Sequence, residues 1–297
     1  MLPDIIIGKY DREVNLIKHL WQNLATILVV ALLAFGGWQL FGPKVEPTRL
    51  AGVTTKVKHL NVVGVGDSLT HGVGDATDSG GYVELIKRDL EQSGDYTVTA
   101  ANFGVTGNTA PQVQHRLDSQ PKMQKAVKQA NVITLTVGGN DLMAVLQKHF
   151  FDMTAKDVAN GNAQFQKRLL KLVKTLRADN PDAPIYVFGI YNPFYVYFPN
   201  LTAMTTSVQK WNSGTKQTLT KVDHAYYVDI DSVLTKGNTS DKSKATKKAL
   251  KDAVNGDSSA NPLIFTQDHF HPNNAGYAQM TKQLWQVMAK TKNQWER

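Results

Sequence analysis

Short apolar segments rich in β-branched residues alternate with longer segments of helical periodicity along most of this chain. The apolar segments are 60–65, 96–101, 132–137, 184–190 and 225–230, and the helical segments are 82–92, 164–177, 205–222 and 275–290. Strands that are apolar almost throughout are typical of parallel sheets covered by helices on both faces. The alternation therefore predicts an α/β fold with a five-stranded, mainly parallel sheet.

A serine follows the first predicted strand, in Gly-Asp-Ser-Leu-Thr at residues 66–70. In open parallel sheets, ligands bind beyond the carboxyl ends of the strands. A serine at a strand-to-helix turn presents its hydroxyl and its own N–H to one space, so Ser68 is a candidate nucleophile. Taken alone, a serine that merely caps a helix is the simpler interpretation. Thr70 replaces the second glycine of the Gly-x-Ser-x-Gly turn, which disfavours an α/β-hydrolase.

Two further polar clusters follow the second and third predicted strands, at residues 102–108 and 138–141. The backbone N–H of Gly104 and the side-chain amide of Asn140 are candidates to stabilise an oxyanion together with the N–H of Ser68. The alternatives are a plain loop glycine, and a helix cap at Asn140 or Asp141. Both clusters are expected at the same sheet edge as the serine.

A carboxylate stands three residues before a histidine, just ahead of the last predicted helix. An imidazole that removes a serine proton needs a carboxylate to fix its tautomer, which suits Asp268 and His271. Residues 272–273 acting only as a helix start are one alternative. A metal site at His269 and His271 is the other, and it is disfavoured because a zinc or iron site needs further suitably spaced ligands.

The order of these motifs resembles the GDSL, or SGNH, esterase and lipase family. The matching motifs are Gly-Asp-Ser-Leu (66–69), Asn-x-Gly-x-x-Gly (102–107), Gly-x-Asn-Asp (138–141) and Asp-x-x-His-Pro (268–272). The resemblance runs from about residue 60 to the end of the chain. It implies a three-layer α/β/α sandwich similar to flavodoxin, with strand order 2-1-3-4-5, and an enzyme that needs neither metal nor organic cofactor.

The resemblance also implies a role for each site residue. Ser68 is the nucleophile, and His271, oriented by Asp268, is the general base and then the general acid. The oxyanion hole consists of Ser68, Gly104 and Asn140. Members of the family cleave carboxylic esters, including lysophospholipids, short acyl esters and acetylated sugars.

An aromatic-rich segment, residues 191–199, follows the fourth predicted strand. Tyr191, Phe194 and Tyr195 are candidates to bind the acyl group or to touch a membrane, although packing beneath a long loop explains them equally well. The sequence favours a serine esterase that hydrolyses lipid-like or short acyl esters through an acyl-enzyme on Ser68. The alternatives are a deacetylase of O-acetylated cell-wall glycans and a catalytically silent wall- or lipid-binding module.

An uncharged apolar stretch lies near the beginning of the chain, where no residue from Leu20 to Pro43 is ionisable. About 20 apolar residues suffice to cross the ~30 Å hydrocarbon core of a bilayer. We therefore expect a short N-terminal segment (1–19), a transmembrane anchor (20–42), a linker (43–58) and a hydrolase domain (59–297). A cleavable signal peptide and a buried core helix are the alternatives to the anchor. The expected localisation is membrane-anchored with the catalytic domain outside the cell, or secreted after cleavage.

Composition excludes several classes of protein. The 297 residues include no cysteine, which excludes a disulfide framework, a thiolate nucleophile and an iron–sulfur cluster. The formal net charge is +8 and lies after residue 42, because the charges before that point balance. Such a charge favours loose attraction to anionic surfaces such as phospholipid head groups or wall polymers. Nucleic acid is not expected as a partner, because the lysines are scattered and no recognition motif accompanies them.

Overall fold

The computed structural model describes residues 57–148, 154–198, 200–237 and 261–297. These residues contain a five-stranded sheet in the order β2-β1-β3-β4-β5, in which every neighbouring pair is parallel. The strands are β1 (Lys58–Gly66), β2 (Tyr96–Gly104), β3 (Val132–Thr136), β4 (Ile185–Phe188) and β5 (Ala225–Val228). The predicted parallel sheet is therefore confirmed, each strand at its expected place in the sequence.

Helices connect the strands and cover the sheet. Four of them, α3 (Tyr82–Gln92), α7 (Ala155–Asp179), α8 (Thr202–Leu219) and α11 (Asn274–Lys290), correspond to the helical segments expected from the sequence. The described residues also form α2 (Ser68–His71), α4 (Ala110–Ser119), α5 (Pro121–Lys128), α6 (Gly139–Lys148), α9 (Asp231–Leu234) and α12 (Lys292–Trp295).

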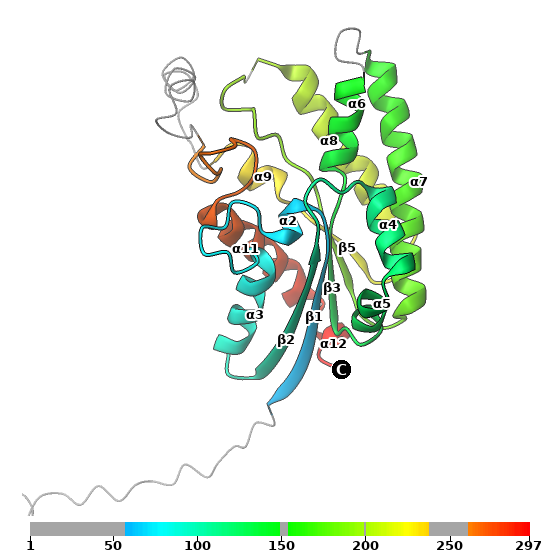
Figure 1. Cartoon of the computed structure of the whole chain (residues 1–297), viewed down its shortest axis with the longest axis vertical. Coiled ribbons are helices and arrows are strands. Elements are labelled where there is room, and N and C mark those ends of the chain that lie inside the picture. Colours follow the sequence, from blue (N-terminus) through cyan, green and yellow to red (C-terminus); the bar gives the residue numbers. More distant parts are fainter. Residues whose placement is uncertain (1–56, 149–153, 199, 238–260) are drawn as a thin grey trace, which may run out of the picture. The chain divides into compact units, whose positions relative to one another are not determined.

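The sheet is the middle layer of an α/β/α sandwich (Figure 1). Successive strand side chains point to opposite faces, so Val63 and Val65 join one core cluster while Leu60 and Val62 join the other. Helices α4, α5, α7 and α8 cover the first face, and α3, α9, α11 and α12 cover the second. Both faces of the sheet are thus buried, as its almost continuously apolar strands require.

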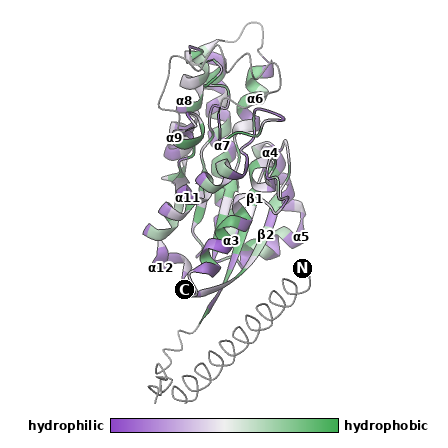
Figure 2. Cartoon of the chain, turned by 90° about the vertical axis from the view of Figure 1, so that its left-hand side faces the viewer, coloured by the Kyte–Doolittle hydropathy of each residue, from purple (hydrophilic) through white to green (hydrophobic). Residues whose placement is uncertain are grey.

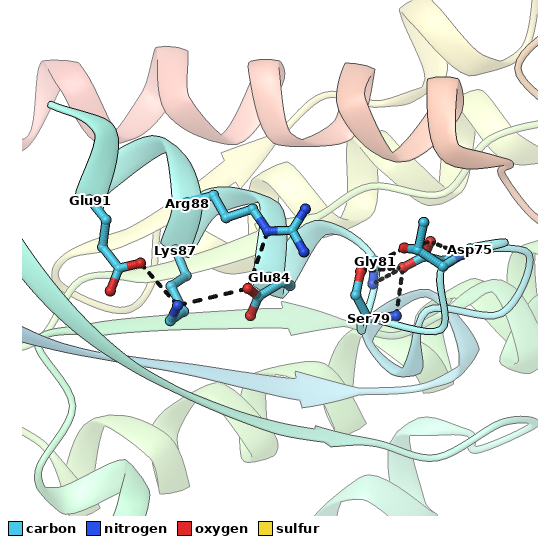
Figure 3. A network of polar contacts seen from close by, with 8 residues as sticks. Asp75, Ser79, Gly81, Glu84, Lys87, Arg88 and Glu91 are labelled. Carbon is cyan, nitrogen blue, oxygen red and sulfur yellow. Dashed lines mark hydrogen bonds and ion pairs between the residues drawn. The ribbon is translucent and has the colours of Figure 1, made fainter.

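Helix α3 illustrates how the outer layers form. Its buried residues are Tyr82, Val83, Ile86 and Leu90, whose spacing of three to four places them on one face. Its outer face carries the ion pairs of Lys87 with Glu84 and Glu91, and of Arg88 with Glu84 (Figure 3). Figure 2 shows hydrophobic and hydrophilic residues together along this helix. The helix is therefore amphipathic, and burial of its apolar face against the sheet fixes its position.

The described structure does not support the expected membrane anchor. Among the described helices, none combines the length and the apolar character that a bilayer crossing needs. Helix α7 has 25 residues and is long enough, but several lysines and arginines interrupt it. Residues 20–42, to which the anchor was assigned, lie outside the described ranges, as do the N-terminal segment and nearly all of the linker. No described helix supports the expected membrane-anchored localisation.

Candidate active site

Ser68 stands at the carboxyl end of the central strand β1. Gly66 ends this strand at φ +153°, and a Cβ there would lie 2.4 Å from the Thr136 carbonyl oxygen of the neighbouring strand. Asp67 then caps the short helix α2, because its side chain accepts the N–H of Leu69 at 3.0 Å. Ser68 is the first residue of this helix, where backbone N–H groups have no helical acceptor. Strand, cap and helix together present both the hydroxyl and the N–H of Ser68.

Three side chains form a continuous hydrogen-bonded chain at this edge. The Oγ of Ser68 lies 2.8 Å from Nε2 of His271, and Nδ1 of the same ring lies 2.6 Å from Oδ2 of Asp268. The other oxygen of Asp268 accepts the N–H groups of Phe270 at 2.9 Å and of His271 at 3.0 Å. Serine, imidazole and carboxylate are thus placed as a nucleophile, a base and an orienting group would be.

Burial and hydrogen bonding act oppositely on Asp268. Partial burial raises the pKa of its carboxyl group, but the hydrogen bonds from the His271 ring and the two backbone N–H groups outweigh burial and lower it. A carboxylate that stays ionised is the form that accepts an N–H of the ring and stabilises an imidazolium.

The loop before α11 holds His271 in place through backbone bonds. Ile264 and Pro272 form an isolated antiparallel bridge, and Phe265 N–H donates to the His271 carbonyl at 2.8 Å. Asn273 then caps α11 by accepting the N–H of Gly276 at 3.0 Å. Residues 272–273 therefore do mark a helix start, and this does not compete with the placement of His271 beside Ser68.

Asn140 reaches the same place from the beginning of α6. Its Nδ2 donates to the backbone carbonyl of Asn108 at 3.0 Å, which fixes the direction of the amide, and the side chain lines the cavity beside Ser68. The neighbouring Asp141 accepts the N–H of Ala110, the first residue of α4, at 2.9 Å. Asn140 thus lines the cavity, whereas Asp141 lies inside α6 and accepts the first N–H of α4, whose N-cap is Thr109.

Gly104 lies close to the serine segment but is not among the residues that line the cavity. Its N–H donates to Oδ1 of Asn102 at 2.9 Å, and a Cβ at this position would lie 2.0 Å from the backbone nitrogen of His71. The lack of a side chain lets β2 approach α2. The structure therefore brings Ser68 and Asn140 to the cavity and leaves the N–H of Gly104 bonded to Asn102.

A cavity of about 40 Å³ opens beside Ser68. Besides Leu69 and Tyr191, the apolar residues that line it are Val137, Ile190, Pro193 and Phe270. Val137, Ile190, Pro193 and Phe270 were not among the predicted site residues, although Pro193 lies in the aromatic segment and Phe270 lies within the Asp-x-x-His-Pro motif; tertiary packing brings the four together. A cavity of this size has room for a few water-sized groups.

The aromatic segment contributes unequally to the cavity. Tyr191 lines it, and its hydroxyl donates to the Phe270 carbonyl at 2.5 Å. Phe194 and Tyr195 are not among the lining residues. The ring of Phe194 lies near that of Phe270, with 6.1 Å between the centroids. Tyr191 is thus the member of the predicted aromatic set that reaches the cavity.

The rings of His269 and His271 bond to different partners. Its Nδ1 lies 3.1 Å from the hydroxyl of Tyr197, whereas His271 bonds to Ser68 and Asp268. Within the described ranges, no group of three or more ligating side chains is placed to hold a metal ion.

Comparison with known proteins assigns most of the chain to one family. Residues 65–279 match the GDSL-like Lipase/Acylhydrolase family. The chain is 31% identical to the uncharacterized protein YpmR of Bacillus subtilis. The alignment spans 246 residues, which is 82% of this chain and 88% of that protein. The chain is 26% identical over 175 residues to the spore germination lipase LipC of Bacillus licheniformis, covering 58% of this chain and 78% of that one.

Solved structures share the fold. The lipase Lip_vut3 from a goat rumen metagenome superimposes with a TM-score of 0.61 at 23% identity, over 77% of this chain and 97% of that chain. TesA gives a TM-score of 0.52 at 19% identity, over 77% and 98% respectively. The family match supports a hydrolase of the esterase and lipase class. The chain belongs to the GDSL-like lipase/acylhydrolase family.

Proposed function

We propose that this protein is a serine esterase that transfers the acyl group of a carboxylic ester first to Ser68 and then to water. The observation that carries the proposal is the hydrogen-bonded chain from Ser68 Oγ through the His271 ring to Asp268. Nε2 of His271 takes the hydroxyl proton as Oγ attacks the carbonyl carbon, and then gives it to the leaving alcohol. A water molecule activated by the same ring releases the acid and restores the serine.

The negative charge that develops on the carbonyl oxygen needs donors that are already in place. Ser68 N–H and the second hydrogen of the Asn140 amide are the proposed donors, since Asn108 accepts only one hydrogen of that amide. Gly104 N–H would join them once it leaves the side chain of Asn102, to which it donates in this structure. Each such donor typically contributes about 10²- to 10³-fold to the rate.

The cavity favours a short acyl group. Its volume of about 40 Å³ and its wall of Val137, Ile190, Pro193 and Phe270 suit the apolar end of an acetyl or slightly longer group. A long lipid chain would extend beyond it. The same size favours a second candidate substrate, the acetyl group of an O-acetylated cell-wall glycan.

A series of p-nitrophenyl esters from acetate to long chains, assayed with the full chain and its Ser68→Ala variant, tests the proposal. We expect the highest kcat/KM for the shortest esters, and hydrolysis at the uncatalysed rate for the variant. Release of acetate from acetylated wall glycan, set against the p-nitrophenyl acetate rate, distinguishes the two substrate candidates. Uncatalysed rates for both proteins on every ester would contradict an esterase and favour a binding module.

A further inference from the structure

Arg116 extends from α4 behind the candidate site and is half-buried. Its guanidinium donates three hydrogen bonds: Nε to Oδ1 of Asn108 at 2.7 Å, Nη1 to the carbonyl of Phe103 at 2.9 Å, and Nη2 to the carbonyl of Gly66 at 2.7 Å. All three acceptors are neutral. Within the described part of the chain, no carboxylate forms an ion pair with this guanidinium, although Asp67 is near enough to raise its pKa.

The three acceptors belong to the segments that carry the proposed oxyanion donors. Gly66 ends β1 two residues before Ser68, and Phe103 shares its peptide group with the N–H of Gly104. Asn108 accepts the amide of Asn140 with its backbone oxygen, while its side-chain oxygen accepts Nε of Arg116. One planar side chain therefore ties the end of β1 to the segment 103–108, although Gly66 and Phe103 are 37 residues apart in the sequence, and it reaches the amide of Asn140 through Asn108.

We propose that Arg116 is a positioning residue for the oxyanion hole, an inference that rests on the proposed function of Ser68. The fork of a guanidinium holds several oxygens in fixed directions, which an ammonium group cannot do. Through Asn108 it fixes the direction in which Asn140 donates. Through the strand-end carbonyls it fixes the ends of β1 and β2 relative to each other.

A second arginine offers a matched control. Arg177, on α7, is also half-buried and also donates three hydrogen bonds to neutral oxygens, here all backbone carbonyls: those of Asp223 at 3.1 Å, Asn180 at 2.8 Å and His224 at 3.3 Å. These residues precede β4 and β5, so they lie at the amino ends of the strands, opposite the site. Burial lowers the pKa of both arginines, and it outweighs the opposite effect of Asp67 on Arg116 and of Asp223 and Asp182 on Arg177. The two arginines differ mainly in where their acceptors lie: those of Arg116 are in the segments of the proposed oxyanion donors, and those of Arg177 are at the opposite end of the sheet.

The test compares Arg116→Lys and Arg177→Lys in the full chain, with kcat and KM for p-nitrophenyl acetate and the melting temperature measured for each. Both substitutions are expected to lower Tm. Arg116→Lys is expected to lower kcat about 10-fold or more with KM within about 2-fold, because only transition-state stabilisation is lost. Arg177→Lys is expected to leave kcat within about 2-fold, because its acceptors do not touch the site.

A double-mutant cycle with Asn140→Ala separates positioning from general stability. If Arg116 acts through Asn140, Arg116→Lys lowers kcat by clearly less in the Asn140→Ala background than in the wild-type background. Asn108→Ala removes the side-chain oxygen that accepts Nε of Arg116 and leaves the arginine itself unchanged. It is expected to lower kcat about 3-fold or more, and it replaces Arg116→Lys in the test if that variant does not fold.

Two outcomes would overturn the inference: equal kcat for the Arg116 and Arg177 variants, or effects of Arg116→Lys and Asn140→Ala that simply multiply. The Ser68→Ala variant distinguishes this failure from failure of the proposed function. If Ser68→Ala keeps wild-type activity, the proposed function itself is wrong. If Ser68→Ala is inactive while Arg116→Lys equals wild type, only the role of Arg116 is wrong.

Discussion

Nε2 of His271 lies 2.8 Å from Oγ of Ser68, although 203 positions separate the two residues in the chain. The central strand β1 delivers the serine, and the loop before α11 delivers the histidine. A hydrogen bond with so large a sequence separation forms only when the sheet and its covering helices are assembled. Loss of the contact would therefore be expected to accompany unfolding of the domain.

Asn140→Ala is expected to lower kcat about 100-fold or more and to change KM little, because an oxyanion donor acts mainly in the transition state. Steady-state kinetics with p-nitrophenyl acetate measure both constants. Asn131→Ala is the control, since its amide accepts the N–H of Asn61 at 2.9 Å at the opposite end of β3. Equal rates for the two variants would remove Asn140 from the site.

Removing the bulk of Ile190 should widen the acyl preference. Ile190→Ala enlarges the cavity beside Ser68, so kcat/KM for hexanoate relative to acetate is expected to rise about 10-fold, as one to three methylene groups typically allow. The control is Ile185→Ala, which truncates a buried residue at the beginning of β4, outside the cavity wall. An unchanged ratio for Ile190→Ala would show that the acyl group lies elsewhere.

Asp67 is expected to make the protein less stable as pH rises. Burial raises the pKa of its carboxyl group, and the hydrogen bonds from Thr136 and Leu69 offset burial only in part. Because the pKa in the folded state exceeds the unfolded value of about 3.9, stability is lost as pH rises from there through the raised pKa. Asp67→Asn removes this loss and keeps an oxygen acceptor for both donors.

Urea unfolding of wild type and Asp67→Asn at pH 4 and pH 7 measures the effect. The free energy of unfolding of the variant minus that of wild type is expected to be larger at pH 7 than at pH 4. A difference between the two proteins that does not change with pH would contradict the buried, hard-to-ionise carboxyl group.

Asp75 is expected to behave in the opposite way. Its carboxylate accepts from Ser79 and Gly81 (Figure 3) and from Thr77 in the loop before α3, and from the Asn274 amide at the beginning of α11. Partial burial raises the pKa of Asp75, but these hydrogen bonds outweigh it and hold the pKa well below its ordinary value. The stabilisation is therefore present above about pH 4 and is lost as pH falls further.

Asp75→Asn is expected to lower the free energy of unfolding by about 1 kcal/mol at pH 7, a figure that allows for solvent screening of this partly exposed group. The loss should shrink below about pH 4, where the wild-type carboxylate begins to be protonated. Asp78→Asn, in the same loop at φ +49°, is the control, since asparagine tolerates this conformation. Equal losses for both variants at pH 7 would contradict a special role for Asp75.

Sequence periodicity predicted the strands and long helices well because their burial patterns are regular. Helices α4 and α5 were missed because each opens with a proline in its first turn and buries only a few apolar residues, too few for a clear period. Helix α7 begins at Ala155, nine residues before the predicted start of 164, since polar residues fill its first turns. A capping box at Thr154 and Asp157 marks that start in the sequence.

The site was predictable to the extent that its side chains follow strands. The positions of Ser68 and Asn140 follow from the rule that the carboxyl ends of parallel strands meet at one edge, whereas His271 lies in the loop before α11 and is indicated by its motif with Asp268. The cavity wall and the bond from Gly104 N–H to Asn102 were not predictable, because they depend on how side chains pack in three dimensions. The same holds for Arg116, which no motif of the sequence singles out.

The most direct test of the central claim is to treat the full chain with a serine-directed fluorophosphonate and to map the modified residue by peptide mass spectrometry. We expect a single adduct on Ser68, loss of ester hydrolysis in proportion to labelling, and no adduct at that peptide in Ser68→Ala. Inactivation accompanied by an adduct on a different residue, or undiminished hydrolysis by Ser68→Ala, would contradict that claim.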